Sequence, residues 1–378
     1  MITTINNKHN KLNVPNLRFK EFQGEWEKCK LGDLCNVLMC KRILASQTNT
    51  EEGVPFYKIG TIGNAPDAYI SKELFDDYKT KYNYPHKGEV MITCAGTVGK
   101  CVIYDGKDAY YQDSNIVWID NPSQCISNSF LYHLLAKVDW RKLNSTTIIR
   151  IYNDDLRNLK LSYPQIEEQQ KISRLLSFLD ERIVTQNKII DKLQSLIKGI
   201  RNDVYGKLRK SVGFNAMISD VLSYEQPQPY IVENTEYTAE GIPVLTANKA
   251  FVLGYTSEIN GIYDKGDCII FDDFTLDCKY VDFPYKIKSS AIKILTAKNK
   301  ELLRYTFEFL KYLDLSTEEH KRHYIAETQN QEFILPTMHI VSTIAHTFSA
   351  LSLRMESVVK QRNMFETQKQ YLLRQMFI

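Results

Sequence analysis

The chain has 378 residues, of which 43% are hydrophobic and 25% are charged, and its formal net charge is +3. This length allows two sizeable cores in a soluble protein, and no apolar run approaches the roughly 18 residues of a membrane span. The net charge is too small to indicate nucleic-acid binding by itself, although a local basic face can coexist with acidic surface elsewhere. The N-terminus has no apolar signal core, which favours a cytoplasmic protein.

Two similar globular units are predicted along the chain. They follow a polar, flexible lead-in at residues 1–15 and occupy residues 16–163 and 208–335. In both units short β-rich runs lie between Gly, Asn and Asp turn signals, and each unit contains one predicted helix. The predicted strands are Val90–Thr93, Val102–Tyr104, Ile116–Ile119, Cys268–Phe271 and Ala291–Leu295, and the predicted helices are Asn128–Leu143 and Glu301–Leu313.

A long amphipathic segment follows each unit, at residues 164–207 and 336–378. Its apolar residues recur at alternating three- and four-residue steps, which is the heptad spacing of a coiled coil. Pro164 and Pro336 mark the starts, where proline is tolerated. We expect two helices of about 35–40 residues, roughly 50–60 Å long, that pack antiparallel; the alternative is that each packs only on its own unit. The predicted seam consists of Ile172, Leu175, Leu179, Ile183, Ile190, Leu193, Ile197, Ile200, Ile344, Phe348, Leu351, Met355, Val358, Phe365 and Leu372.

The two halves of the chain repeat short phrases in the same order. The paired phrases are Glu52–Pro55 and Glu240–Pro243, Lys87–Ile92 and Lys265–Ile270, and Arg150–Tyr152 and Arg322–Tyr324. A tandem duplication of a globular unit plus a helix predicts a pseudo-two-fold molecule. Such a molecule suits a target that is itself roughly two-fold symmetric.

Several further phrases carry a family resemblance. They are Pro15–Phe19 ahead of Trp26, Gly53–Phe56, Gly88–Ile92, Gly96–Gly99, Pro164–Ile172, Gly241–Val244, Phe271–Thr275 and Ser289–Ala291. In order and spacing they resemble the specificity (S) subunits of type I restriction–modification systems. The second long helix lacks the Glu-Glu-Gln-Gln-Lys phrase of the first, and the second unit lacks a Gly-Thr-Val-Gly turn. Residue roles therefore transfer less directly to the second half.

The resemblance implies an α+β fold in which two tandem mixed α/β target-recognition domains are joined by two long antiparallel coiled-coil helices with pseudo-two-fold symmetry. Residues 164–207 would be the family's central conserved spacer helix and residues 336–378 its C-terminal one. Each domain would read one half of a bipartite double-stranded DNA sequence. Two modification (methyltransferase) subunits would dock on the chain, with restriction subunits joining them. The chain itself would be non-catalytic and without a cofactor, while partner subunits would bind S-adenosylmethionine and ATP.

Candidate DNA contacts are polar residues between the predicted strands and at the helix junctions. Arg and Lys pair with guanine, Asn pairs with adenine, and hydroxyl and Arg donors hold phosphates. The repeated Arg-x-Tyr phrase favours a DNA contact over a junction ion pair, whereas any single loop candidate is more often solvated surface. The candidates are Lys41, Arg42, Lys58, Asn64, Lys79, Lys81, Tyr82, Thr97, Lys100, Thr146, Arg150, Asn248, Lys249, Lys279, Tyr280, Lys286, Arg322 and Tyr324.

Other kinds of site are poorly supported. A P-loop needs glycine and Ser or Thr where Cys94 and Cys101 stand. His320 and His323 lack a third metal ligand nearby in sequence, and the cysteines form no C-x-x-C pair, which favours reduced thiols over a zinc ribbon or a disulfide framework. Asp282–Tyr285 only superficially resembles a methyltransferase tetrapeptide. The main alternative function is a duplicated coiled-coil adaptor that does not bind DNA.

Overall fold

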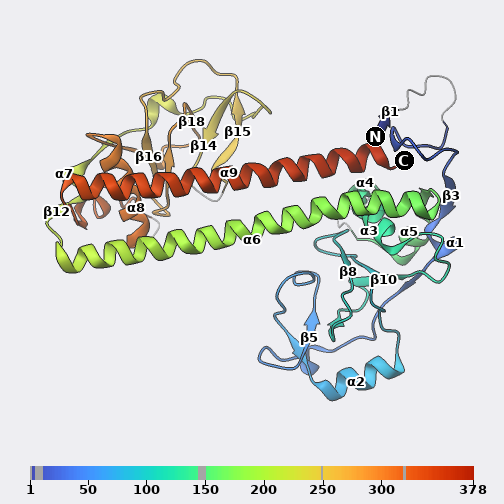
Figure 1. The fold of residues 1–378 in the computed structure, drawn as a ribbon. Coiled ribbons are helices and arrows are strands. Elements are labelled where there is room, and N and C mark those ends of the chain that lie inside the picture. Colours follow the sequence, from blue (N-terminus) through green and yellow to red (C-terminus); the bar gives the residue numbers. More distant parts are fainter. Residues whose placement is uncertain (1, 5–11, 144–149, 248–249, 318–320) are drawn as a thin grey trace. The chain divides into compact units, whose positions relative to one another are not determined.

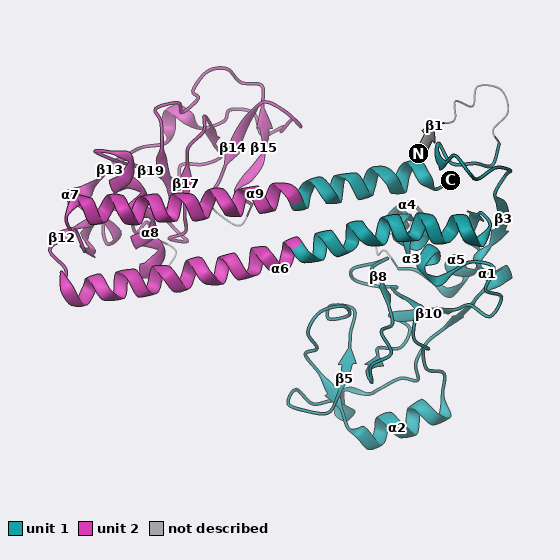
Figure 2. Ribbon diagram, in the orientation of Figure 1, with its two compact units in different colours: residues 1–185, 362–378 teal, residues 186–361 magenta. Residues whose placement is uncertain are grey.

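The protein is described by a computed structural model that covers residues 2–4, 12–143, 150–247, 250–317 and 321–378 (Figure 1). The chain divides into two compact units (Figure 2). The first unit contains residues 1–185 and 362–378, and the second contains residues 186–361. Each unit therefore holds one globular body together with parts of the two long helices.

The globular body of the first unit is built around a four-stranded antiparallel sheet in the order β4-β10-β7-β8. A smaller sheet, β6-β5-β9, contains the parallel pair β5/β9. Strands β3 and β11 pair antiparallel and bring the beginning and end of the body together. The bounds are β3 Glu27–Lys30, β4 Asn36–Leu38, β5 Val54–Tyr57, β6 Tyr69–Ile70, β7 Val90–Thr93, β8 Cys101–Ile103, β9 Tyr110–Tyr111, β10 Ile116–Asp120 and β11 Lys160–Tyr163. The helical segments are α1 Leu31–Leu34, η1 Ala45–Gln47, α2 Lys72–Lys81, α3 Asn128–Lys137, α4 Trp140–Leu143 and α5 Asn153–Arg157.

The second unit repeats this topology. Its four-stranded sheet has the order β13-β19-β16-β17, its smaller sheet is β15-β14-β18 with a parallel β14/β18 pair, and β12 pairs with β20. The strand bounds are β12 Ala216–Met217, β13 Leu222–Glu225, β14 Ile242–Leu245, β15 Val252–Thr256, β16 Cys268–Asp272, β17 Cys278–Val281, β18 Lys286–Ile287, β19 Ile292–Ala297 and β20 Glu332–Phe333. The helical segments are α7 Ile218–Val221, η2 Gln228–Tyr230, α8 Lys300–Leu313 and η3 Thr328–Asn330.

The repeated Glu-Gly-x-Pro phrase has the same structural cause in both units. Gly53 precedes β5 with φ +124°, and a Cβ there would lie 2.3 Å from the carbonyl oxygen of Ile70. Gly241 precedes β14 with φ +129°, and a Cβ there would lie 2.4 Å from the carbonyl oxygen of Thr256. Only glycine can combine this backbone conformation with so close an approach. The same geometry therefore requires glycine at both positions.

Two long helices run through both units: α6, Ile166–Ser211, and α9, Met338–Met376. In the first unit Leu176 and Leu179 of α6 share a core with Leu372 and Leu373 of α9. In the second unit the C-terminal part of α6 shares a core with the N-terminal part of α9 through Tyr205, Leu208, Val341, Ile344 and Phe348. Within each unit the two helices are therefore antiparallel, as the heptad pattern predicts.

The predicted seam agrees with the burial of the two helices. Each seam residue is buried or half-buried, whereas Lys188, Lys192 and Glu356 on other faces are exposed. An ion pair also links the two helices beside the seam: Lys369 Nζ of α9 donates to Asp180 Oδ1 of α6 at 2.5 Å. Both helices begin two residues after the prolines that mark their starts, and α6 continues to Ser211, past the predicted end at residue 207.

The phrase Glu167–Gln170 anchors α6 in the first unit. Glu168 is buried and forms a bidentate ion pair with the buried Arg18, with Nε···Oε1 at 2.8 Å and Nη2···Oε2 at 2.7 Å. The amide of Gln169 donates to the carbonyl oxygens of Cys125 and Pro164, both at 2.8 Å. This pair of side chains therefore ties the helix to β2 (Leu17–Phe19), to the loop before α3 and to Pro164, just ahead of its own start.

A buried histidine lies where α3 meets the long helices. His133 of α3 is 1% exposed, neither ring nitrogen has a hydrogen-bond partner among the described residues, and Asp180 Oδ2 lies 4.0 Å from Nδ1. Burial lowers the pKa of His133 to about 4; nearby Asp180 opposes this shift and Lys369 favours it. The imidazole is therefore neutral and behaves as a core side chain at neutral pH.

This burial predicts a pH-dependent stability of the first unit. The folded-state pKa of His133 lies below the ordinary value of 6.5. Its contribution is thus fully present above about pH 6.5 and is lost as the pH falls toward 4, by roughly 3 kcal/mol in total. We expect His133→Leu to flatten this acid loss without destabilising the unit near neutral pH. Hydrogen exchange of β7 and β10 amides at about pH 7 and pH 5 measures it; equal acid loss in both proteins would contradict the assignment.

Several predicted elements are corrected by the structure. The predicted helix Asn128–Leu143 is broken into α3 and α4, and α2 was not predicted at all. Within the lead-in predicted to be flexible, Ile2–Thr4 forms strand β1, which pairs antiparallel with β2. The predicted strand Val90–Thr93 is present with the same ends, and the remaining predicted strands and the helix Glu301–Leu313 are present with an end shifted by one or two residues.

Candidate nucleic-acid interface

A glycine turn closes the end of strand β7 in the first unit. The Thr93 hydroxyl donates to the Thr97 carbonyl and accepts from the Lys100 backbone N–H at 3.0 Å. Gly96 and Gly99 have φ of +64° and +83°, and a Cβ on Gly99 would lie 2.2 Å from Cδ1 of Trp140. The turn is therefore rigid, and it presents Thr97 exposed at its tip.

A second loop, residues 58–64, is tied to this turn. Lys100 Nζ donates to the Ile62 carbonyl at 2.5 Å, so this lysine links the two loops in addition to carrying a positive charge. Lys58 pairs with Asp67 at 3.0 Å, and Asn64 is exposed. The structure thus brings the candidates Lys58, Asn64, Thr97 and Lys100 together on two touching loops.

The Arg-x-Tyr junction joins the same group of loops. The Ile151 N–H donates to the Cys94 carbonyl at 2.8 Å. The guanidinium of Arg150 donates to Asn115 Oδ1 at 3.2 Å and to the Ser114 carbonyl at 3.0 Å. Ser114 has φ +54°, an uncommon conformation for a non-glycine residue and one that marks candidate functional loops. Arg42 reaches the same loop, with Nε 3.7 Å from Asp113.

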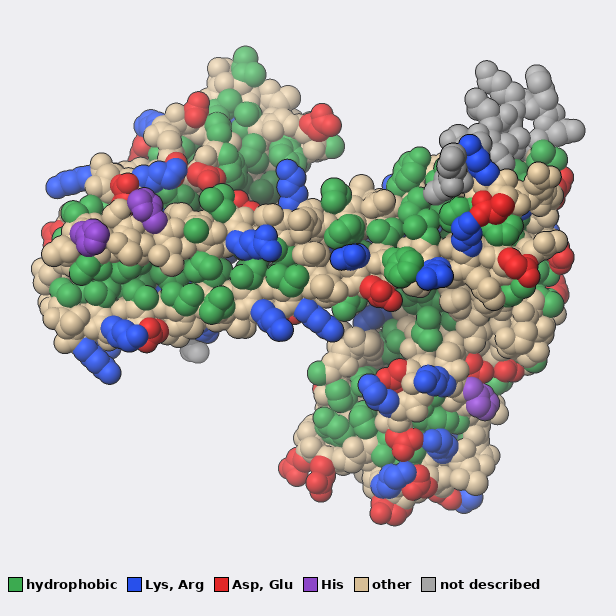
Figure 3. All heavy atoms as spheres, viewed as in Figure 1, with side chains coloured by type: hydrophobic (Ala, Val, Ile, Leu, Met, Phe, Trp, Pro, Cys, Tyr) green, Lys and Arg blue, Asp and Glu red, His purple; other side chains and the backbone are tan. Residues whose placement is uncertain are grey.

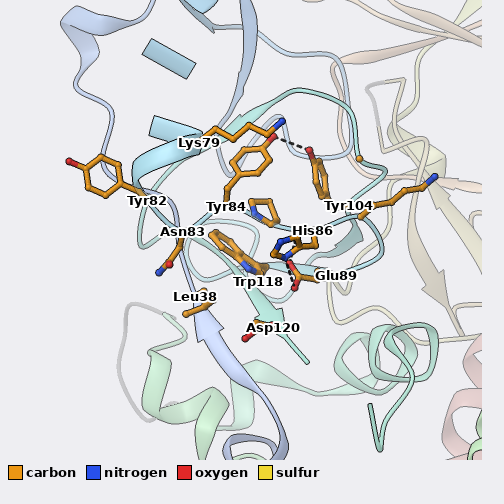
Figure 4. A pocket seen from close by; sticks show the side chains of 13 residues that line it. Leu38, Lys79, Tyr82, Asn83, Tyr84, His86, Glu89, Tyr104, Trp118 and Asp120 are labelled. Atoms are coloured by element: carbon orange, nitrogen blue, oxygen red, sulfur yellow. Dashed lines mark hydrogen bonds and ion pairs between the residues drawn. The ribbon is translucent and has the colours of Figure 1, made fainter. Parts of the chain in front are cut away.

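A hollow of about 550 Å³ lies beside α2 (Figure 4). Tyr82 and Lys79 line it, and Lys41 Nζ lies 5.3 Å from the Tyr82 ring centroid. At its back, Glu89 is buried beside His86, and burial raises the pKa of its carboxyl group. Lys79 pairs with Asp108 at 2.9 Å and Lys81 with Asp77 at 2.5 Å. Lys79 and Lys81 lie in helix α2 and Tyr82 is its C-cap, so the loop placement predicted for these three residues is wrong.

The second unit has the equivalent junction. The His323 N–H donates to the Asp273 carbonyl at 3.0 Å, in the place of the Ile151–Cys94 bond of the first unit. Asp273 Oδ1 accepts from the N–H groups of His323 and Tyr324 at 3.0 and 2.7 Å. Arg322 is exposed beside this anchor. The repeated phrase therefore builds the same backbone junction twice and places an arginine next to it each time.

Other candidates of the second unit lie away from exposed loops. Lys286 is 3% exposed in strand β18, where Nζ pairs with Glu258 at 2.5 Å and donates to the Asn260 carbonyl at 2.7 Å. Tyr324 is 1% exposed inside the core. Lys279 and Tyr280 belong to strand β17, and the Tyr280 hydroxyl donates to Asp267 at 2.6 Å. The loop placement predicted for Lys279, Tyr280 and Lys286 is wrong, because all three lie in strands, and the side chains of Lys286 and Tyr324 are buried.

Three candidates, Thr146, Asn248 and Lys249, lie outside the described residues. Sequence reasoning also missed a residue: Tyr152 is 61% exposed next to Arg150, whose guanidinium lies 5.9 Å from its ring centroid. An exposed ring beside an arginine is a platform on which a base can stack. The recurrence of the whole Arg-x-Tyr phrase was the available signal, but its tyrosine is exposed in one unit and buried in the other.

Charge is mixed over the globular body of the first unit. In Figure 3 the Lys and Arg side chains of this body alternate with Asp and Glu on the visible face. A DNA interface on this body would thus depend on individual Lys and Arg side chains rather than on one continuous basic surface. In the part of the chain that the structure describes, no group of three or more His, Cys, Asp or Glu side chains could hold a metal ion. None of the helices described there is both long and apolar enough to cross a membrane.

Known proteins are similar to this chain over part of its length. Residues 23–195 match the family described as "Type I restriction modification DNA specificity domain". A putative type I restriction enzyme specificity subunit of Haemophilus influenzae, S.HindORF215P, is 48% identical over 169 residues, which are 45% of this chain and 43% of that protein. The EcoR124I/EcoR124II specificity subunit of Escherichia coli is 43% identical over 126 residues, 32% of this chain and 31% of that protein. The matched part is thus less than half the length of these relatives.

The fold is also shared with a solved structure. The S subunit of a type I restriction–modification system from M. genitalium superimposes with a TM-score of 0.66 at 15% sequence identity. The alignment covers 97% of this chain and 99% of that one. Since the identity is low, this likeness concerns the fold, which extends over the second unit as well as the first.

Proposed function

We propose that this chain, whose residues 23–195 match the type I restriction modification DNA specificity domain family, reads a bipartite DNA target, one half-site per globular unit. The observation that carries the proposal is this family match, which includes the Gly96–Gly99 turn and the Arg150 junction. Both features belong to the rigid group of touching loops described above. Rigid loops on a sheet scaffold are the usual carriers of recognition.

The repeated scaffold supports the two-reader proposal. The sheets, the Gly53 and Gly241 turns and the junction bonds recur in both units, whereas the loops between them differ. In particular, α2 and the hollow beside it belong to the first unit, at a place where the second unit's sequence has no matching phrase. One scaffold with two loop sets suits a DNA sequence whose two halves differ.

The same proposal extends to partners. Two modification subunits would dock on the chain and restriction subunits would join them. The chemistry, with S-adenosylmethionine and ATP, would lie on those partners and not on this chain. A duplicated adaptor that does not bind DNA is the competing function, and DNA binding separates the two.

DNA binding by the full chain with its modification subunit should be steeply salt-dependent, because phosphate contacts release counterions. Replacing Arg150 or Arg322 by alanine should weaken binding to all sequences and reduce the slope of log K against log salt by about 0.9 for each phosphate that is no longer neutralised. Lys210→Ala, at an exposed position of α6 far along the chain from either junction, is the control. Fluorescence anisotropy with mixed-sequence duplexes measures both quantities. Absence of binding even with the modification subunit would favour the adaptor.

A further inference from the structure

A large cavity opens within the second unit between the long helices and the globular body. Its volume is about 850 Å³, which is in the range of small-molecule sites. Residues of α6 and α9 form one wall, and residues of α8, β17 and neighbouring loops form the other. The residues on which the argument rests are Arg201, Lys279, Tyr280, Arg304, Phe307 and Lys311.

The deep wall carries a buried cluster with more positive than negative charge. Glu308, 1% exposed, accepts from Arg201 through Oε2 at 2.9 and 2.7 Å and from Arg304 through Oε1 at 2.7 Å. Both carboxylate oxygens are therefore engaged by two guanidinium groups. An uncompensated charge in such a place is costly unless an anion meets it.

A second cluster on the wall has the same imbalance. Asp277 pairs with Lys311 at 2.5 Å and with Lys279 at 3.2 Å, so that one carboxylate again serves two cations. Lys300 and Asp267, by contrast, form a balanced pair at 2.8 Å. The remaining charged lining residues, Lys198, Asp282 and Glu356, are exposed, where water screens them. The buried cluster around Glu308 and the half-buried cluster around Asp277 together leave an excess of two positive charges.

Arg304 has one donor without a partner. It is 8% exposed, it lines the cavity, and among the described residues its buried Nε has no hydrogen-bond partner. Its Nη2 also donates to the Phe348 carbonyl at 3.3 Å and to Ser352 Oγ at 2.5 Å. Its guanidinium lies 5.0 Å from the Tyr280 ring centroid and 5.4 Å from that of Phe307. Phe251 and Phe283, 6.2 Å apart between ring centroids, add further aromatic surface to the lining.

We infer that this cavity binds a small organic phosphate: a phosphate monoester on a flat aromatic body, of mononucleotide size. A phosphate monoester carries a charge of about −1.5 to −2 at neutral pH, which matches the excess of the two clusters. The guanidinium of Arg304 and the amines of Lys279 and Lys311 hold the phosphate, and the aromatic side chains receive the flat body. The site is independent of DNA reading, and it gives Lys279 and Tyr280 a role other than base contact.

The test is calorimetric titration of the full chain with three probes: adenosine 5′-monophosphate, adenosine and inorganic phosphate. The monophosphate should bind with one site per chain and at least about tenfold more tightly than either fragment, since each fragment makes only part of the contacts. Arg304→Gln, Lys279→Gln and Lys311→Gln should each weaken it by about tenfold or more. Lys298→Gln, an exposed lysine outside the cavity in the same unit, should leave it unchanged.

If Arg304→Gln does not fold, the Lys279→Gln and Lys311→Gln variants still test the inference. Their side chains are about one-third exposed at the cavity rim, so these substitutions should not prevent folding. Melting temperature and circular dichroism verify the folding of each variant. Equal affinity for adenosine and its monophosphate, or binding that is unchanged in the lysine variants, would overturn the inference. So would displacement of the bound monophosphate by a short DNA duplex, which would assign the cavity to the DNA interface instead.

Discussion

Replacing Glu168 with alanine is expected to destabilise the first unit by about 3–5 kcal/mol, because it leaves the buried guanidinium of Arg18 without its carboxylate. Arg18 would keep only its bonds to the carbonyl oxygens of Gly24 at 2.6 Å and Gln23 at 3.1 Å. The side chains of Arg18 and Glu168 are 6% and 1% exposed, so water cannot take the place of the missing carboxylate. Urea unfolding followed by hydrogen exchange of the β7 and β10 amides measures the destabilisation.

The neighbouring Glu167→Ala is the matched control for this prediction. Glu167 is exposed one position earlier in the same first turn of α6, so its removal tests the loss of a carboxylate near the helix start without opening the buried pair. We expect an effect of about 0.5 kcal/mol. Equal effects of the two substitutions would show that the Arg18–Glu168 pair does not anchor the helix.

Replacing Gly53 or Gly241 with alanine should destabilise its own unit by about 3 kcal/mol or more, because a strained φ is combined with contact of the new Cβ with a backbone carbonyl. The oxygen atoms concerned, those of Ile70 and Thr256, belong to paired strands and cannot move freely. Hydrogen exchange should place the destabilisation in the first unit for Gly53→Ala and in the second for Gly241→Ala.

Gly24→Ala separates the two parts of this effect. Gly24 has φ +80°, and nothing lies within 4 Å of a Cβ built there. Its substitution carries only the conformational cost, about 1–2 kcal/mol. If Gly53→Ala and Gly24→Ala had equal effects, the close approach to Ile70 would contribute nothing, and the repeated phrase would have no common steric cause.

The long helices were predictable because their signal is repeated many times. A seam of apolar residues at heptad spacing averages over local exceptions, and the prolines mark the starts. The resemblance to type I specificity subunits, carried by the order of many short phrases, is confirmed over part of the chain by the family match at residues 23–195 and by the curated relatives. Domain boundaries and the DNA-contact residues stay predictions.

The missed elements lacked such a signal. Helix α2 buries only Phe75, so its sequence shows no apolar period, although Ser71 caps it by accepting from the Leu74 N–H at 3.2 Å. The break between α3 and α4 begins at Val138, whose backbone is extended, and Trp140 just beyond it packs on Gly99, a residue that is distant in sequence. Lys286 looks like a surface lysine, and only the fold brings Glu258 to it. Contacts and ion pairs between residues so far apart in sequence are set by tertiary structure.

Sequencing of methylated bases in cells that carry this chain and its modification subunit tests the central claim most directly. We predict a methylated motif in two parts separated by a gap. Exchange of residues 208–335 for the same segment of another specificity subunit should change one part of the motif and leave the other intact. A motif without a gap, or a change in both parts after the exchange, would contradict the assignment of one DNA reader to each unit.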